Sequence, residues 1–383
     1  MKLKIKKTFT VPGFSLSGIS CGIKNKGQKD LALLTSEVPA NAAGVFTQNQ
    51  VIAASVTYDR KIVKSAGKVC AIIVNSGNAN ACTGAQGMKD CHAVANAQAK
   101  ERGFAKDEVL VASTGVIGVS LQTEKIVGAI PRLAKQLSPR GWGNAASAIL
   151  TTDLAGKTAA VSYKSNGKII VVGGVAKGSG MIHPNMATML AFLATNISIP
   201  AKTLQRVLKT ATDLTFNKIT VDGDTSTNDM ALCLANGLAG NAPVALRSKE
   251  LSAFQEALTC VCKDLAMKIV RDGEGATKFV TIQALGAKTS ADAEQVAKTI
   301  ANSKLVKTAL FGADPNWGRI IAAVGNAGVS IQPEKVGITL NKIPLVRKGS
   351  PVSGKFLPAL RKSMRKKEIL IFFMKIFESF RRL

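Results

Sequence analysis

The most specific chemistry in this sequence lies in the segment 177–196, which reads KGSGMIHPNMATMLAFLATN. Thr188 stands out because its hydroxyl can attack a carbonyl group, although a threonine hydroxyl is a weak nucleophile unless a base lies beside it. If the chain is cut before Thr188, the new α-amine can act as that base, since its ordinary pKa of about 7.7–8.0 suits proton transfer near neutral pH. One interpretation is therefore a self-cleaving protein with an N-terminal threonine nucleophile.

A second interpretation of the same segment needs no chemistry. Asn185 or Thr188 can cap a helix that runs to Leu193, because a side-chain oxygen at the cap accepts a hydrogen bond from a backbone N–H of the first turn. Taken alone, the segment favours this helix cap. Other parts of the chain have to decide between the two interpretations.

Two further motifs fail at a required position. Residues 156–158 (GKT) end like a phosphate-binding loop, but the glycine expected five positions before Gly156 is Thr151. Residues 222–228 (DGDTSTN) resemble a calcium-binding loop, but the sixth position, where such a loop requires glycine, is Thr227. We therefore expect neither of these two ligand sites.

Strands and helices alternate along the chain, and no repeat of 20–50 residues is present. Apolar residues at helical spacing predict core-facing helices at 202–217 and 249–270. Short runs rich in β-branched residues predict buried strands, and these runs lie at 69–74, 109–112, 168–172 and 279–284. This order predicts an α/β or α+β protein.

The net charge is strongly positive, with 51 Lys and Arg against 24 Asp and Glu and a formal charge of +27. Such an excess is typical of nucleic-acid binding. The basic residues are spread over the whole chain, however, aromatic residues are scarce, and no zinc-finger, RNA-recognition or KH motif is present. Because a diffuse positive field also attracts anionic small substrates, we do not expect nucleic acid as the main partner.

The cysteines and the apolar runs indicate a cytoplasmic protein. Seven scattered cysteines in a long chain fit reduced thiols better than a disulfide framework, and two histidines, His92 and His183, leave little room for a metal site. No run approaches the ~18 apolar residues of a membrane-spanning helix, and the N-terminus lacks the apolar stretch of a signal peptide.

The segment around Thr188 closely resembles the self-cleavage motif of the ornithine acetyltransferase family, the bifunctional glutamate N-acetyltransferases of arginine biosynthesis. Further blocks resemble this family in the same order over residues 10–345, and an ordered set is far more specific than any single block. They are DLAL at 30–33, AGVFT at 43–47, NSGNANACTG at 75–84, STGVIG at 113–118, TTD at 151–153, RDGEGATK at 271–278 and GADPNWGR at 312–319. The set favours the nucleophile interpretation of Thr188.

This resemblance implies a reaction sequence. Thr188 would attack the carbonyl of Ala187 and split the chain into an α chain, residues 1–187, and a β chain, residues 188–383. The freed Thr188 would then take the acetyl group from N2-acetylornithine and pass it to L-glutamate, in a ping-pong reaction through an acetyl-threonine. Some members of the family also use acetyl-CoA as the donor.

The resemblance also assigns roles to residues outside this segment. Thr114 and Gly115 match the pair that forms the family's oxyanion hole, which stabilises the tetrahedral intermediate of acyl transfer. Their ordinary interpretation is a turn at the end of a strand.

Three more residues match substrate-contacting positions of the family. Lys177 matches a substrate-site lysine, and Glu274 matches the acid that holds the amino group of the amino-acid substrate. Thr151 matches a substrate-contacting threonine, although Thr152 beside it keeps this choice open. The ordinary interpretations are a surface lysine for Lys177 and a solvated turn for Glu274.

The fold implied by the resemblance is a layered α/β protein, an α-β-β-α sandwich of the ornithine acetyltransferase and DmpA-like type. It has helices outside two packed sheets and a smaller C-terminal α/β domain. The family forms α2β2 tetramers, and it needs no metal or organic cofactor because the threonine itself carries the acetyl group.

The end of the chain departs from the family pattern. The family closes with strands that carry a substrate-binding Asn and Thr, whereas the last such residues here are Asn341 and Thr339. We therefore expect the resemblance to end near Gly354 and residues from about 355 to 383 to be an atypical tail. In that case cleavage would survive while acetyl transfer would be weakened.

The tail has a pattern of its own. Residues 361–383 contain eight basic and two acidic side chains, and Ile369, Phe373, Ile376 and Phe380 fall on one helical face. This spacing predicts a basic amphipathic helix, which can pack on its own domain, dock on a partner or lie on an anionic membrane surface.

Two alternatives to the acetyltransferase stay open at this point. The first is an N-terminal-threonine hydrolase or aminopeptidase, in which water takes the acyl group. The second is a catalytically impaired basic binding protein that attaches to nucleic acid or an anionic membrane through its tail.

Overall fold

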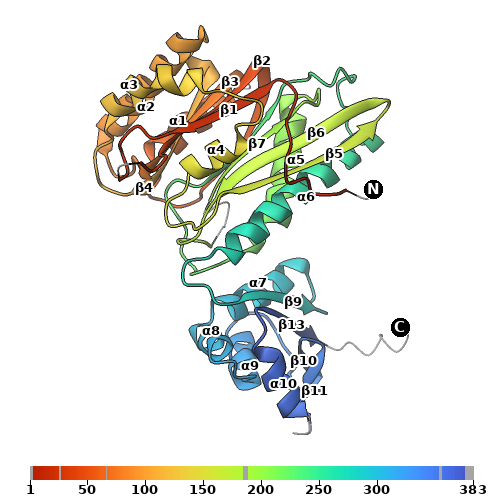
Figure 1. The fold of residues 1–383 in the computed structure, drawn as a ribbon. Coiled ribbons are helices and arrows are strands. Elements are labelled where there is room, and N and C mark those ends of the chain that lie inside the picture. Colours follow the sequence, from red (N-terminus) through yellow and green to blue (C-terminus); the bar gives the residue numbers. More distant parts are fainter. Residues whose placement is uncertain (1–2, 26, 66, 184–188, 353–355, 376–383) are drawn as a thin grey trace. The chain divides into compact units, whose positions relative to one another are not determined.

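The structure is a computed structural model that describes residues 3–25, 27–65, 67–183, 189–352 and 356–375. The predicted nucleophile Thr188 and the preceding Ala187 lie outside the described residues. The chain divides into two compact units, Met1–Glu274 and Gly275–Leu383 (Figure 1), and each is described by itself.

The first unit is built on an eight-stranded sheet in which β2 pairs with strands from both halves of the unit. Its first part pairs antiparallel with β1 and β3, and its last part pairs antiparallel with β8. In sheet order the strands are β4 (Val109–Val116), β3 (Lys68–Asn78), β2 (Leu31–Phe46), β8 (Met230–Ala235), β7 (Leu190–Thr195), β6 (Lys168–Lys177) and β5 (Lys157–Ser165), with β1 (Phe14–Ile19) paired to β2 off this path.

Helices cover this sheet in layers. They are α1 (Ala54–Lys64), α2 (Gly84–Arg102), α3 (Thr123–Lys135), α4 (Trp142–Ala148), α5 (Ala201–Leu214) and α6 (Lys249–Arg271), with short 3-10 turns at Lys106–Glu108 and Phe216–Lys218. Successive side chains of a strand point to opposite faces, so Leu190 and Phe192 of β7 join the core that contains α1 to α4, whereas Ala191 and Leu193 join the core that contains α5 and α6. The layered α/β class predicted from the sequence is confirmed.

Strand pairing joins the two halves of the sheet in the first unit. It runs without a break from β4 to β5. The reason is the length of β2, whose 16 residues are enough to pair with β3 near one end and with β8 near the other.

The second unit is a smaller α/β domain with a buried core of its own, as predicted. Its sheet has the order β12-β11-β10-β13-β9. The elements along the chain are β9 (Phe279–Leu285), α7 (Ser290–Asn302), α8 (Lys304–Phe311), α9 (Trp317–Gly325), a 3-10 turn at Pro333–Lys335, β10 (Val336–Leu340), β11 (Ile343–Arg347), β12 (Ser350–Pro351), α10 (Leu357–Met364) and β13 (Glu368–Lys375).

The elements predicted from periodicity are confirmed. The four β-branched runs lie within β3, β4, β6 and β9, and the two apolar stripes are α5 and α6. In α6 the stripe residues Phe254, Leu258, Val261, Leu265 and Ile269 are fully buried, which is what core packing requires of them. Long, strongly periodic segments are therefore identified correctly.

The helix that the cap interpretation required is not present at residues 189–195, the part of that segment that the structure describes. Residues 190–195 form strand β7, and each of them is buried. A strand covered on both faces shows a continuous apolar run, and such a run cannot be distinguished from a buried helix by its pattern alone. The prediction of a capped helix ending at Leu193 is therefore wrong.

The amphipathic helix predicted for the tail is also wrong where the structure describes it. Residues 368–375 form β13, which pairs antiparallel with β10 on one side and parallel with β9 on the other. Ile369, Ile371 and Phe373 are buried at a spacing of two, and β-branched and aromatic residues favour such a position. Ile376 and Phe380 lie outside the described residues.

The central position of β13 gives a stability prediction. Ile371 is fully buried, so Ile371→Ala should reduce the free energy of unfolding of the second unit by about 3 kcal/mol through lost burial and a cavity. Met374 is 44% exposed, and Met374→Ala should cost less than about 0.5 kcal/mol. Urea unfolding of both variants measures the difference, and equal midpoints would contradict a central strand at 368–375.

Candidate active site

The first unit contains a cavity of about 570 Å³ into which residues from distant parts of the chain project. Its lining includes Thr114, Gly115, Thr151, Lys177 and Glu274, which are all the described residues that the family resemblance singled out. These residues come from the end of β4, the loop before β5, the end of β6 and the residue that ends the first unit after α6. The fold therefore brings together residues that lie up to 160 positions apart in the sequence.

Lys177 is the buried cation of this cavity, with only 8% of its surface exposed. Its Nζ donates a hydrogen bond of 2.6 Å to Thr151 Oγ1 and one of 3.4 Å to Thr114 Oγ1. Burial lowers the pKa of Lys177, while the nearby carboxyl groups of Asp153 and Asp229 limit the decrease. The alternative interpretation of Lys177 as a surface lysine is therefore wrong.

The contact from Lys177 also bears on the choice between two neighbouring threonines. Both Thr151 and Thr152 line the cavity, but the hydroxyl of Thr151 accepts the hydrogen bond from the lysine. Because that bond fixes where the Thr151 oxygen lies, Thr151 is the better candidate for a substrate contact.

The backbone at Gly115 has a conformation that side chains rarely adopt. Its φ angle is 136°, and a Cβ placed on it would lie 2.3 Å from the carbonyl carbon of Gly77 on the neighbouring strand. Only glycine allows β4 to pass this close to β3. Thr114, directly before it, is 9% exposed and lies beside the Lys177 ammonium group, so an oxyanion at this place would meet polar and positive groups.

Glu274 follows the turn after α6 and is exposed at the cavity. Its backbone N–H donates a 3.0 Å hydrogen bond to the Ser179 carbonyl, and a Cβ on Gly180 would lie 2.3 Å from its Oε2. The Glu274 carboxylate therefore lies directly against Gly180. With Lys177, this acid gives the cavity one group for a carboxylate and one for an ammonium group, as an amino-acid substrate requires.

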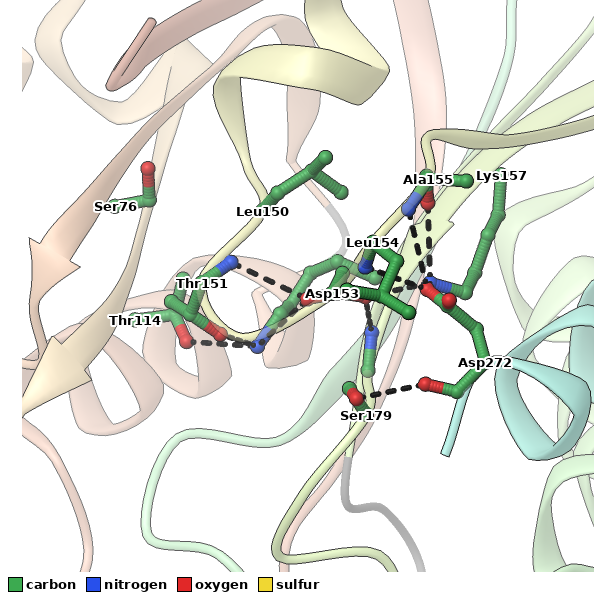
Figure 2. A network of polar contacts seen from close by, with 12 residues as sticks. Ser76, Thr114, Leu150, Thr151, Asp153, Leu154, Ala155, Lys157, Ser179 and Asp272 are labelled. Atoms are coloured by element: carbon green, nitrogen blue, oxygen red, sulfur yellow. Dashed lines mark hydrogen bonds and ion pairs between the residues drawn. The ribbon is translucent and has the colours of Figure 1, made fainter. Parts of the chain in front are cut away.

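Asp153 is a site residue to which sequence reasoning assigned no role, although it ends the quoted block TTD. Its Oδ1 accepts hydrogen bonds from Lys157 Nζ at 2.7 Å and from the Gly178 N–H at 2.6 Å (Figure 2). Its Oδ2 lies 3.8 Å from Lys177 Nζ. Burial alone would raise the pKa of Asp153, but the two lysines and the hydrogen bonds together lower it below its ordinary value.

A second buried ion pair continues this network to α6. Lys157, from the failed phosphate-loop motif, also donates to Asp272 Oδ2 at 2.6 Å, and the same oxygen accepts from the N–H groups of Leu154 and Ala155 (Figure 2). The Asp272 carbonyl accepts from Ser179 Oγ at 2.7 Å. The loop before β5, the segment after β6 and the end of α6 are thereby tied together below the cavity.

The start of β7 forms another wall of the cavity. Met189 and Leu190 line it, and Leu190 is paired in register with Lys177 of β6. The residue before Met189 in the sequence is Thr188, which lies outside the described residues, as does Ala187.

The segment that resembled a calcium loop makes contacts within the protein. The carboxylate of Asp222 accepts hydrogen bonds from the backbone N–H groups of Met181 and Ile182. Among the residues that the structure describes, no cluster of three or more His, Cys, Asp or Glu could hold a metal ion. Within the same residues, no helix is long and apolar enough to cross a membrane.

Comparisons with known proteins point in one direction. Residues 15–374 match the model of the ArgJ family. The arginine biosynthesis bifunctional protein ArgJ of Gloeobacter violaceus is 50% identical over 342 residues, which cover 89% of this chain and 84% of the relative. The protein of the same name from Symbiobacterium thermophilum is 47% identical over 360 residues, which cover 94% and 89%. Ornithine acetyltransferase from Mycobacterium tuberculosis, solved in complex with ornithine, is 38% identical, with 49% of this chain and 100% of that chain covered and a TM-score of 0.46.

The extent of the family match corrects one expectation. The resemblance was expected to end near Gly354, but the match continues to residue 374. Residues 357–364 and 368–375 are the elements α10 and β13, and both contribute to the buried core of the second unit. The strongly basic composition hid this pattern.

The buried carboxylate gives a prediction for stability and its pH dependence. Asp153→Asn removes the anion from between two buried lysines and should cost about 3 kcal/mol at pH 7. Because the folded-state pKa of Asp153 is below its ordinary ~3.9, its contribution is complete above about pH 4 and is lost as the pH falls through the lowered pKa. The difference between wild type and variant should therefore shrink below about pH 4.

Urea unfolding at pH 7 and at lower pH measures this difference. The matched control is Asp213→Asn, which breaks an exposed ion pair to Lys209 of 2.6 Å and should cost less than about 1 kcal/mol. A loss at Asp153 no greater than that at Asp213 would contradict the role given to the buried network.

Proposed function

This chain belongs to the ArgJ family, and from that premise we propose that the cavity of its first unit is the active site of a self-cleaving acetyltransferase of arginine biosynthesis. The enzyme moves the acetyl group of N2-acetylornithine to L-glutamate, which gives ornithine and N-acetylglutamate. The observation that carries this proposal is the gathering of Thr114, Gly115, Thr151, Lys177 and Glu274 around one cavity that Met189 also lines.

Cleavage creates the catalytic group. The Thr188 hydroxyl attacks the carbonyl carbon of Ala187, the bond from that carbon to the Thr188 nitrogen breaks, and an ester replaces the amide. Water then hydrolyses the ester, which leaves residues 1–187 with a new carboxylate and residues 188–383 with a free Thr188 amine. Since Thr188 is bonded to Met189 in the cavity wall, chain connectivity supports its place at the cavity.

Acetyl transfer uses the same hydroxyl twice. The Thr188 amine takes the hydroxyl proton while the oxygen attacks the acetyl carbonyl of N-acetylornithine, and the tetrahedral oxyanion lies against Thr114 and Gly115. The intermediate collapses, ornithine leaves with the proton on its nitrogen, and acetyl-Thr188 remains. The amine of glutamate then attacks this ester, and the Thr188 hydroxyl is restored.

Charge selects the substrates. Donor and acceptor are both amino acids with an α-carboxylate, and Lys177 supplies a buried positive charge for it. Lys24 lines the same cavity, and its Nζ is held by a 2.8 Å hydrogen bond to the Leu150 carbonyl. Glu274 at the same cavity binds the substrate's ammonium group. The spread of positive charge over the whole chain attracts carboxylate substrates in the same way.

The rival functions differ in how the structure bears on them. A threonine hydrolase would use the same residues, so only its products distinguish it from the transferase. The basic binding protein depended on an amphipathic tail helix, and residues 368–375 form a strand instead. The α2β2 assembly, the use of acetyl-CoA and the cytoplasmic location are parts of this proposal that rest on the family resemblance and on the sequence.

Intact-mass analysis tests the nucleophile. The purified wild-type chain should give two fragments that meet at Ala187 and Thr188, whereas Thr188→Ala should stay a single uncut chain because it lacks the attacking oxygen. Thr210→Ala removes an exposed hydroxyl of α5 that donates only to the Arg206 carbonyl and does not line the cavity, so it is the matched control and should be cut like the wild type. An uncut wild-type chain would contradict the proposal.

Isotope exchange separates the transferase from the hydrolase. Without glutamate, the cleaved enzyme should exchange labelled ornithine into N-acetylornithine, because the ping-pong intermediate can return its acetyl group to ornithine. Mass spectrometry measures the label in N-acetylornithine, with the Thr188→Ala chain as the blank. Release of acetate without exchange would instead favour the hydrolase.

A further inference from the structure

Four consecutive residues directly before β8, Ser226 to Asp229, line the cavity but have no role in the reaction as described above. Three of them belong to the segment that resembled a calcium loop. Thr227, Asn228 and Asp229 are polar and almost completely buried, with 7%, 4% and 3% of their surfaces exposed. Polar groups this deeply buried need partners within the protein, and those partners show what the segment holds in place.

Asn228 holds the strand that carries Thr114 and Gly115. Its Nδ2 donates hydrogen bonds to the Ala79 carbonyl at 2.5 Å and to the Ser113 carbonyl at 2.8 Å. Its Oδ1 accepts from Thr227 Oγ1 at 2.6 Å, so the amide is fixed at both ends. Because Ser113 is bonded to Thr114, the side chain of Asn228 sets the backbone position of the oxyanion pair.

Asp229 holds the other side of the reaction. Its carboxyl group accepts a 3.1 Å hydrogen bond from the Ser226 N–H, and the backbone N–H of Met189 also donates to it. The next residue, Met230, donates its N–H to the Met189 carbonyl at 3.1 Å. Both polar backbone groups of Met189 are thus fixed by residues 229 and 230, and Met189 is bonded to Thr188.

The surroundings of Asp229 indicate that its carboxyl group serves to accept these hydrogen bonds. It is completely enclosed, and burial raises its pKa, while the Ser226 and Met189 donors and the Lys177 charge oppose the increase. If a buried carboxyl group made no hydrogen bonds that the protein needs, an apolar side chain of similar size at that position would make the protein more stable. Here each donor that it satisfies belongs to the segment itself or to the residue after Thr188.

From these contacts we infer that Asn228 and Asp229 are positioning residues: Asn228 holds the backbone that carries Thr114 and Gly115, and Asp229 holds Met189, the residue bonded to the proposed nucleophile. The inference rests on the proposed function. It has a physical basis in the steep dependence of acyl transfer on alignment, where a displacement of about 1 Å can cost about 100-fold in rate. Because Asn228 and Asp229 are adjacent, one short stretch of backbone carries both contacts.

The test compares the rate of fragment formation, followed by intact mass, in wild type, Asn228→Ala, Asp229→Ala and Asp229→Asn. Both alanine variants should be cut at least about tenfold more slowly. Asp229→Asn should stay within about threefold of the wild type, because the amide oxygen can still accept the Met189 N–H. After cleavage, each alanine variant should show a kcat lowered at least about tenfold with KM for N-acetylornithine changed less than about threefold.

Asn196→Ala is the matched structural control. Asn196 is 2% exposed and also joins backbone groups, since its Nδ2 donates to the Ile169 carbonyl and its Oδ1 accepts from the Val171 N–H, but it does not line the cavity. This variant should lose stability like Asn228→Ala and yet be cut at the wild-type rate. Equal slowing of both variants would overturn the inference.

The outcomes of this experiment distinguish a failure of the positioning role from a failure of the proposed function. If the wild type is cut and the Asn228 and Asp229 alanine variants are cut equally fast, the positioning role is wrong while the proposed function stands. If the wild type is not cut, the proposed function fails and the inference fails with it. Should an alanine variant not fold by circular dichroism, the serine variant of that position, whose hydroxyl is too short to make the same contacts, takes its place with the same two outcomes.

Discussion

The geometry of the cavity depends on the ion pairs and hydrogen bonds that the buried carboxylate of Asp153 makes with Lys157, Lys177 and Gly178. Two lysines lie within 4 Å of it, and neither has more than a tenth of its side chain exposed. Buried ammonium groups are costly unless an anion and hydrogen-bond acceptors surround them. Asp153 provides both, and Asp272 provides a second anion for Lys157. The loop before β5 supplies Asp153, which the residue after β6 contacts, and it also donates to Asp272 at the end of α6, so these three segments cannot move independently.

The order of strands in the sheet would hold the two products of the proposed cleavage together. Under the proposed cleavage, β7 and β8 belong to the second chain, but their outer neighbours in the sheet, β6 and β2, belong to the first. Backbone hydrogen bonds on both sides therefore hold β7 and β8 in the sheet, and the cores on the two faces of β7 contain residues from both sides of the proposed cut. A cut at the start of a central strand releases a terminus without releasing the fragment.

The ends of the strands explain why polar residues gather around the cavity. Lys177 ends β6, Thr114 and Gly115 end β4, and Asp229 precedes β8, so the cavity lies where these strands end or begin beside the start of β7. Hydrogen bonds there cannot all be satisfied by sheet pairing, because the strands stop. Side chains such as Asn228 and Asp153 take over this task, and as a result they fix the backbone of Ser113 and Gly178 beside the cavity.

The sequence by itself determined the family, the α/β class, the helices α5 and α6, the strands β3, β4, β6 and β9, and five residues of the cavity. These follow from periodic patterns and from motifs, which are local. The tertiary structure alone decided that residues 190–195 and 368–375 are strands, because an apolar run shows its period only when it is known which faces are covered. It also decided the contacts of Asp153, Asp272, Asn228 and Asp229. Their partners lie up to about 150 residues away in the sequence, and the cost of burying an unpaired polar group arises only once the chain has folded.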